Sequence, residues 1–166
     1  LENEKLKVSC NPDGSLTILD RQSNDLFENT AFFVDTGDAG HAWVFEPIGQ
    51  EITTLGKKAS ISWVHDSDLF QKLSIKHEME LPADLRARKG ESYEKSTVRI
   101  EMFLTLYKNE KFLRINVEVD NQAESHRLRL HFPMGFEIPF SFGEGQFDVL
   151  KRSTERRDTL DWIEQP

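Results

Sequence analysis

The residues best suited to chemistry on a polar ligand lie in one segment, residues 32–47. It reads Phe-Phe-Val-Asp-Thr-Gly-Asp-Ala-Gly-His-Ala-Trp-Val-Phe-Glu-Pro, so an apolar run leads into Asp35, Asp38, His41 and Trp43. The glycines allow a tightly turning loop, and carboxylates and an indole can hydrogen-bond to and stack on a sugar. Two interpretations stay open on these residues alone: a sugar-binding loop, or a turn held by Asp side chains with Trp43 in the core.

Histidines and carboxylates elsewhere do not form a recognisable site. His126 and His131 lie five residues apart, which places them on opposite faces of a strand, so they cannot share a metal. His65 precedes Asp66 in a stretch that favours a solvated turn over a metal site. The chain has no G-x-S-x-G, H-E-x-x-H or C-x-x-C motif. We therefore expect no catalytic residue, no metal ligand and no cofactor in this chain.

Composition excludes several classes of protein. A formal charge of −8 disfavours a nucleic-acid partner, and no apolar run reaches the roughly 20 residues of a membrane-spanning helix. The one cysteine, Cys10, rules out an internal disulfide and indicates a reducing, cytoplasmic location. We interpret Cys10 as a small buried apolar side chain rather than a nucleophile. Because the chain does not begin with methionine, we expect it to be a piece of a longer protein.

The elements that must position the 32–47 segment follow a period of two, which is typical of strands buried on one face. Turn chemistry separates them: Asn-Pro-Asp-Gly at 11–14, Lys-Asn-Glu-Lys at 108–111 and the 121–125 stretch. The alternating apolar rows are Leu73, Ile75, His77 and Met79; Val98, Ile100, Met102, Leu104 and Leu106; Leu113, Ile115, Val117 and Val119; and Leu128, Leu130 and Phe132.

These patterns predict an all-β fold, an antiparallel β-sandwich formed by one domain over residues 1–166. Two sheets that cover one another are the economical arrangement for half-buried strands without helices. We expect residues 82–97, which are rich in Arg, Lys and Glu, to form an irregular surface loop between two strands. Arg127, Arg129 and His131 should form the polar face opposite Leu128 and its row, with structural ion pairing as their main role.

Four stretches, in order, resemble the domain that follows the catalytic half in glycoside hydrolase family 38, the α-mannosidases. Residues 11–20 resemble the family's opening hairpin, n-x-D-G-S-l-x-i-x-D, and residues 35–40 its D-x-G-D-x-G loop. Residues 121–129 resemble its N-x-x-x-D-H-R-L-R strand. Residues 147–152 resemble its F-x-v-x-x-R strand, with an ending at 162–166 like W-x-E-x-P. Together these stretches span nearly the whole chain.

This resemblance implies a supersandwich β-fold like that of galactose mutarotase. It also implies that this chain is the non-catalytic β-domain of a retaining α-mannosidase. Such a domain packs on its own catalytic domain, and its loops help to wall the active site. The zinc and the aspartate nucleophile of the full-length enzyme would lie in that other domain, which is absent here.

The resemblance further implies substrate-binding residues. Trp43, at the family's tyrosine position, is the foremost candidate to face a sugar, with Asp38 and His41 beside it and Arg152 as a weaker one. His41 and Trp43 depart from the family's aspartate and tyrosine, so the sugar hydroxyls held here would differ.

Two other functions stay open: a stand-alone carbohydrate-binding module, and a mutarotase-like epimerase, which would need a histidine–glutamate pair in one cleft. The resemblance implies an α-mannoside substrate through the full-length enzyme but leaves open which one. It also leaves open the oligomeric state, a homo-oligomer included.

Overall fold

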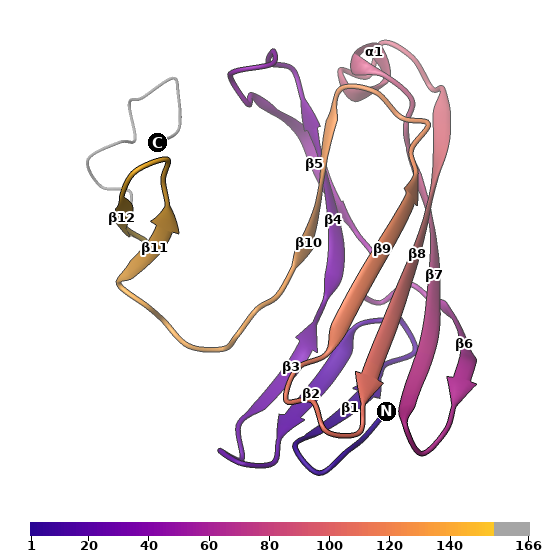
Figure 1. The fold of residues 1–166 in the computed structure, drawn as a ribbon. Helices are drawn as coiled ribbons and strands as arrows, with labels where there is room; N and C mark the ends of the chain where they lie inside the picture. Colours follow the sequence, from indigo (N-terminus) through magenta and orange to yellow (C-terminus); the bar gives the residue numbers. More distant parts are fainter. Residues whose placement is uncertain (155–166) are drawn as a thin grey trace.

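Strands make up most of the chain in the computed structural model, which describes residues 1–154 (Figure 1). The strands of one layer are β1 (Leu6–Cys10), β2 (Leu16–Asp20), β3 (Leu26–Thr30), β4 (Phe32–Asp38), β5 (Pro47–Thr53) and β10 (His126–His131). The strands of the facing layer are β6 (Ser60–Asp66), β7 (Phe70–Pro82), β8 (Lys95–Tyr107) and β9 (Arg114–Asp120). A short helix, α1 (Leu85–Arg88), joins β7 to β8, and a hairpin of β11 (Phe140–Glu144) and β12 (Val149–Ser153) follows β10.

Antiparallel pairing connects the strands of each layer. The first layer contains the sheets β1-β2-β3 and β10-β4-β5, and the second contains β6-β7-β8-β9. The two layers face each other over most of their length (Figure 1). The antiparallel all-β sandwich predicted from the sequence is therefore confirmed.

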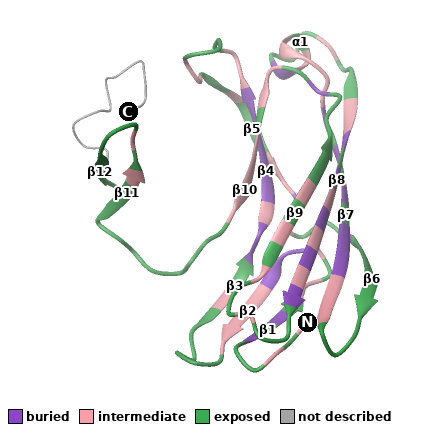
Figure 2. Cartoon of the chain, viewed as in Figure 1, coloured by how far each residue is buried: buried purple, intermediate pink, exposed green. Residues whose placement is uncertain are grey.

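The core lies between the layers, and the predicted alternation of side chains accounts for it. Ile75 and Met79 on β7 and Ile100, Met102 and Leu104 on β8 are each at most 1% exposed. Phe33 on β4 and Leu16 on β2 meet them from the other layer. Figure 2 shows the buried residues running along the facing strands. Burying each of these large side chains contributes about 1.5–3 kcal/mol.

The predicted turns also lie where strands reverse. Residues 11–14 connect β1 to β2, and residues 108–111 lie in the connection between β8 and β9. Two ends of the predicted rows are less buried than expected: Val119 is 44% exposed and Phe132, which follows β10, is 45% exposed.

The irregular loop expected over residues 82–97 is shorter than predicted, because β7 runs to Pro82 and β8 begins at Lys95. Between them Asp84 caps α1 by accepting a hydrogen bond from the Ala87 amide at 2.8 Å. Arg88, the last residue of α1, is buried. The segment is thus partly a structural cover on one end of the sandwich and not wholly a solvated flap (Figure 1).

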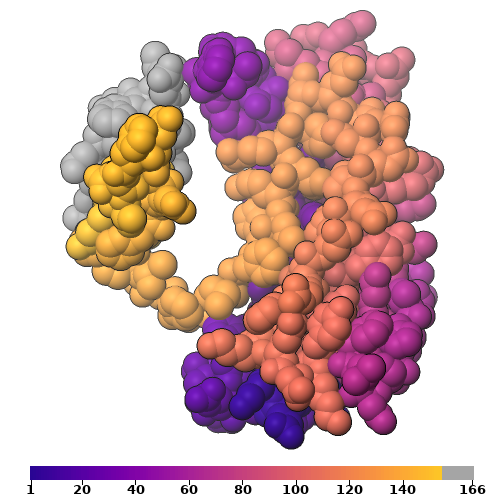
Figure 3. Space-filling view, viewed as in Figure 1, coloured from indigo at the N-terminus to yellow at the C-terminus, as the bar shows by residue number. Residues whose placement is uncertain are grey.

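The β11–β12 hairpin stands apart from the sandwich, to which it is joined by residues 132–139. The space-filling view shows open space between the hairpin and the outer face of the β10-β4-β5 sheet (Figure 3). Every residue of β12 is exposed. Among the described residues, no helix is long and apolar enough to cross a membrane.

Candidate substrate loop and its buried base

The loop between β4 and β5 comprises residues 39–46. The side chain of Asp38, the last residue of β4, closes the neck of this loop, where its two arms meet. Asp38 Oδ1 accepts hydrogen bonds from the amides of Gly40 at 2.9 Å and Glu46 at 3.0 Å. The Ala39 amide donates to the Glu46 carbonyl at 2.8 Å, so both arms of the loop are tied together. Asp38 Oδ1 therefore has a structural role, and its Oδ2 is the oxygen left for a ligand.

His41 and Trp43 lie at the tip of this loop. His41 and Val44 exchange two backbone hydrogen bonds, at 3.0 and 3.1 Å, around a two-residue turn. The turn is tight enough that a Cβ on Gly40 would lie 1.9 Å from the Val44 carbonyl oxygen, which only glycine avoids. The Trp43 amide donates to His41 Nδ1 at 3.3 Å, while the Trp43 side chain is 86% exposed. The indole thus projects from the tip, and the alternative of a core Trp43 is excluded.

Arg152, the fourth predicted site residue, is not near this loop. It lies on β12, where it pairs with Ser141 of β11, and it is exposed. The hairpin and the β4–β5 loop are separated in the fold (Figure 1). The structure therefore brings Asp38, His41 and Trp43 together and leaves Arg152 on a different surface.

A buried charged cluster, formed by Asp35, Arg88 and His126, lies at the base of the loop. The side chains are 0%, 2% and 5% exposed, respectively. Arg88 Nη1 lies 2.6 Å from Asp35 Oδ1, and His126 Nδ1 lies 2.5 Å from Asp35 Oδ2. The contact between Arg88 Nη1 and Asp35 Oδ1 is an ion pair and not a hydrogen bond of good geometry, since Asp35 Oδ1 has no hydrogen-bond partner among the described residues. The three residues come from β4, α1 and β10.

The charge of Asp35 is set by two opposing effects. Burial alone would raise the pKa of this carboxyl, but the contacts from His126 and Arg88 outweigh burial and lower the pKa below its ordinary value. Asp35 is therefore a carboxylate that is hydrogen-bonded to His126 and ion-paired with Arg88. It cannot reach a ligand in the loop, because it is fully buried.

The outer face of the same sheet carries the predicted arginines. Arg127 lies over the Phe45 ring at 3.4 Å from its centroid, which connects β10 to one arm of the loop. Arg129 donates to Glu51 Oε1 at 2.6 Å and to Thr36 Oγ1 at 2.8 Å. Hydrogen bonds from Thr36 and Arg129 lower the pKa of Glu51. The expected structural use of this polar face agrees with these contacts.

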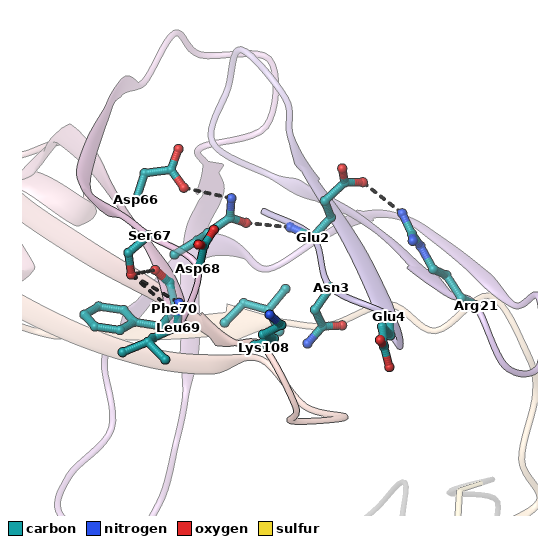
Figure 4. A pocket seen from close by; sticks show the side chains of 12 residues that line it. Glu2, Asn3, Glu4, Arg21, Asp66, Ser67, Asp68, Leu69, Phe70 and Lys108 are labelled. Atoms are coloured by element: carbon teal, nitrogen blue, oxygen red, sulfur yellow. Dashed lines mark hydrogen bonds and ion pairs between the residues drawn. The ribbon is translucent and has the colours of Figure 1, made fainter.

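A pocket of about 640 Å³ lies at the opposite end of the sandwich, between the N-terminal residues and the β6–β7 turn (Figure 4). Two pairs of its polar side chains contact each other: Arg21 with Glu2 at 2.8 Å, and Gln71 with Asp66 at 3.0 Å. Within residues 1–154, no group of three or more His, Cys, Asp or Glu side chains could hold a metal ion.

Sequence reasoning did not find the buried cluster. Asp35 was interpreted as a loop carboxylate, and nothing distinguished Arg88 from the other basic residues of its polar stretch. Asp35 and His126 both lie in stretches that resemble the family, but the sequence alone does not pair them. What the exposed loop can do is present one indole face, Asp38 Oδ2 and His41 Nε2 to a polar ligand.

Comparison with known proteins identifies the family. The sequence model described as the C-terminal domain of family 38 glycosyl hydrolases matches residues 1–165. A putative mannosylglycerate hydrolase of Halalkalibacterium halodurans is 28% identical over 169 residues, which cover 92% of this chain and 19% of that protein.

Two solved structures from Enterococcus faecalis have a similar fold. An α-mannosidase superposes with a TM-score of 0.87 at 28% identity, over 96% of this chain and 20% of its own. A protein of glycosyl hydrolase family 38 superposes with a TM-score of 0.84 at 26% identity, over 92% of this chain and 20% of its own. The chain spans about a fifth of the length of these relatives. The motif resemblance is thereby confirmed: the chain belongs to the C-terminal domain family of the family 38 glycosyl hydrolases.

Proposed function

We propose that this chain is the non-catalytic β-domain of a retaining α-mannosidase, and that its β4–β5 loop helps to wall the active site of the full-length enzyme. The observation that carries the proposal is the 86% exposure of Trp43 at the loop tip. A large aromatic side chain held out by a tied loop leaves apolar surface in water unless a ligand or another domain covers it. One face of a pyranose ring is a suitable cover.

Polar groups beside the indole complete the proposed contact. Asp38 Oδ2 and His41 Nε2 make no hydrogen bond within the described residues, and both lie on the same loop as Trp43. A carboxylate oxygen accepts from sugar hydroxyls, and an imidazole nitrogen either donates to or accepts from them. Arg152 would reach the substrate only if the β11–β12 hairpin meets the active site in the full-length protein.

Catalysis itself is assigned to residues outside this chain. The described residues offer no donor set for zinc, so the zinc implied for the full-length enzyme does not fit this part of it. The His126 side chain is buried against Asp35 and is not open to a substrate. We therefore expect the isolated chain to leave aryl α-mannosides unhydrolysed.

The linker and hairpin supply a surface for packing on the rest of the same polypeptide. Met134, Phe136 and Ile138, each 44–60% exposed, alternate along the linker, and Phe142 continues the row at 69% exposed. A two-stranded hairpin is at best marginally stable alone in water, and the relatives are about five times as long as this chain. We infer that the catalytic domain of the full-length protein covers this row of apolar side chains.

The substrate class proposed for the full-length enzyme is an α-mannoside. Mannosylglycerate-type substrates belong to that class, and one relative is named a putative mannosylglycerate hydrolase. A cytoplasmic location remains our proposal, supported by the presence of a single cysteine.

The decisive experiment is a kinetic comparison in the full-length protein. Trp43→Ala should lower kcat/KM for an α-mannoside by about five- to thirtyfold, the equivalent of 1–2 kcal/mol. Leu69→Ala is the matched control, because Leu69 is 73% exposed in the β6–β7 turn at the far end of the sandwich. Unchanged kcat/KM for both variants would refute the proposed role of the loop.

A stand-alone carbohydrate-binding module is the second candidate, and the exposed indole favours it as well. Calorimetric titration of the isolated chain with mannose and mannosyl oligomers separates the two functions. Submillimolar binding that disappears in Trp43→Ala would favour the module, whereas millimolar or no binding fits a loop that needs the rest of the active site.

A further inference from the structure

The ring of His126 has an oxygen atom next to each of its nitrogens. Nδ1 faces Asp35 Oδ2 at 2.5 Å, and Nε2 faces Asn121 Oδ1 at 3.1 Å. A neutral imidazole has only one N–H, so it can donate to only one of two acceptors. Whether both contacts are hydrogen bonds depends on which atom of Asn121 points at the ring.

The Asn121 amide is fixed by a second contact. Its Oδ1 also accepts a hydrogen bond from the Ala123 amide at 3.1 Å. Exchanging the oxygen and nitrogen of this side chain would aim an NH₂ group at the Ala123 N–H, so the amide oxygen must be the atom that faces His126. His126 Nε2 therefore has to donate, as Nδ1 does to the Asp35 carboxylate. Both contacts are satisfied only when the ring carries two protons.

This assignment makes the buried cluster cationic overall. Arg88 and a doubly protonated His126 contribute two positive charges, and Asp35 is the carboxylate that contacts both. Arg88 Nε and Nη2 are buried without a hydrogen-bond partner among the described residues. Arg88 and His126 contact different oxygens of Asp35 and so hold this carboxylate from two sides. A movement of Asp35 would leave a buried cation without its counter-charge, which is costly.

The cluster lies directly below the first residues of the β4–β5 loop. His126 pairs with Gly37 across the sheet, and the Asp38 amide donates to the Ser125 carbonyl at 2.8 Å. Arg88 Cδ lies only 2.9 Å from where a Cβ on Gly37 would be. Any shift of Asp35 therefore passes along β4 to Asp38, whose side chain closes the neck of the loop.

We propose that Asp35, Arg88 and a doubly protonated His126 act as positioning residues that hold the loop bearing Trp43 at a fixed angle to the sandwich. The positioning role is a property of this chain alone. Only its consequence for substrate rests on the proposed function.

The protonation state is tested first, by nitrogen-15 NMR of the histidine rings at pH 7. The expected spectrum shows both His126 nitrogens protonated, while the exposed His41 serves as the internal comparison. A His126 ring with one protonated and one bare nitrogen at this pH would overturn the assignment.

Hydrogen exchange tests the positioning role. In Arg88→Met, the Gly40 and Glu46 amides should exchange about tenfold faster relative to the turn amides of Ser67 and Glu110 at the far end of the sandwich, since lost contacts to charged groups shift a local opening equilibrium by that factor. Arg86→Met is the matched control, because Arg86 belongs to the same helix but is exposed. Arg88→Lys should restore part of the protection.

The outcomes separate positioning from general stability and from the proposed function. Equal acceleration of the loop amides and the far-end turn amides in Arg88→Met, or no acceleration of either, would overturn the positioning role. Loop-specific acceleration supports it, even if Trp43→Ala leaves kcat/KM of the full-length protein unchanged. That second result would refute only the assignment of the loop to substrate.

Discussion

Removing the guanidinium of Arg88 should destabilise this fold more than any change at an exposed position. Arg88→Met keeps an unbranched side chain of similar length but leaves Asp35, which is 0% exposed, with one cationic neighbour instead of two. Removing one partner of a buried ion pair typically costs about 3–5 kcal/mol, because the remaining charge is left uncompensated. A domain of this kind has roughly 5–15 kcal/mol of stability in total, so the variant should still fold.

A double-mutant cycle isolates the interaction. Asp35→Asn alone leaves two cations without a carboxylate and should be similarly destabilised, whereas the double variant should lose about 1–3 kcal/mol less than the sum of the single losses. The assay is urea unfolding at pH 7, followed by circular dichroism, with Arg86→Met expected within about 0.5 kcal/mol of the unmutated chain. A loss below about 1 kcal/mol for Arg88→Met, or strict additivity in the cycle, would refute the reasoning.

Three further predictions concern the sandwich itself. Gly14→Ala should lower the free energy of unfolding by about 2–5 kcal/mol, since Gly14 has a φ of +78° and a Cβ there would lie 2.6 Å from His77 Cε1. Gly56→Ala, with a φ of +73° and open space around its Cβ, should lose only about 1–2 kcal/mol in the same urea assay, and equal losses would contradict the steric argument. Burial lowers the pKa of His77 below 6.5, although Asp13 opposes this, so the unfolded chain binds a proton first as the pH falls. The stability contributed by neutral His77 is therefore complete above pH 6.5 and declines below it. His77→Leu should make the urea midpoint depend less on pH between about pH 7 and pH 5, and an unchanged pH dependence of the midpoint would contradict this. Cys10 is half-buried, and this burial raises the pKa of its thiol to about 11 from 9.0, so iodoacetamide should modify it about 100-fold more slowly at pH 8 than in the urea-unfolded chain. Equal rates would contradict the raised pKa.

The sequence predicted the sandwich well because alternation along a strand reports directly which face is buried. The inner rows of β7 and β8, from Leu73 to Met79 and from Val98 to Leu106, are buried as expected. Phe132 shows where the rule fails: its row continues in sequence, but β10 ends at His131. Beyond that point the alternating apolar side chains of Met134, Phe136 and Ile138 are exposed, so alternation in this segment does not report a face buried in the sandwich.

The candidate site was predictable only in part. Glycines and a row of chemically capable residues indicated the loop of Asp38, His41 and Trp43, but an alternating pattern cannot tell an exposed indole from a core one. Arg88 could not be found, because burial of an arginine depends on a carboxylate brought to it by a strand about fifty residues earlier in the sequence. Arg152 was inferred from a motif, and motifs carry no information on which surface a hairpin occupies. The predicted ending at residues 162–166 lies outside the described residues.

The most direct test of the central claim is the position of the Trp43 indole in a crystal structure of the full-length protein with an uncleaved α-mannoside bound. We expect the indole to lie in van der Waals contact with the sugar, about 3.5–4 Å from its ring carbons. An active site closed entirely by other segments, with Trp43 facing solvent or packed on protein, would contradict the account.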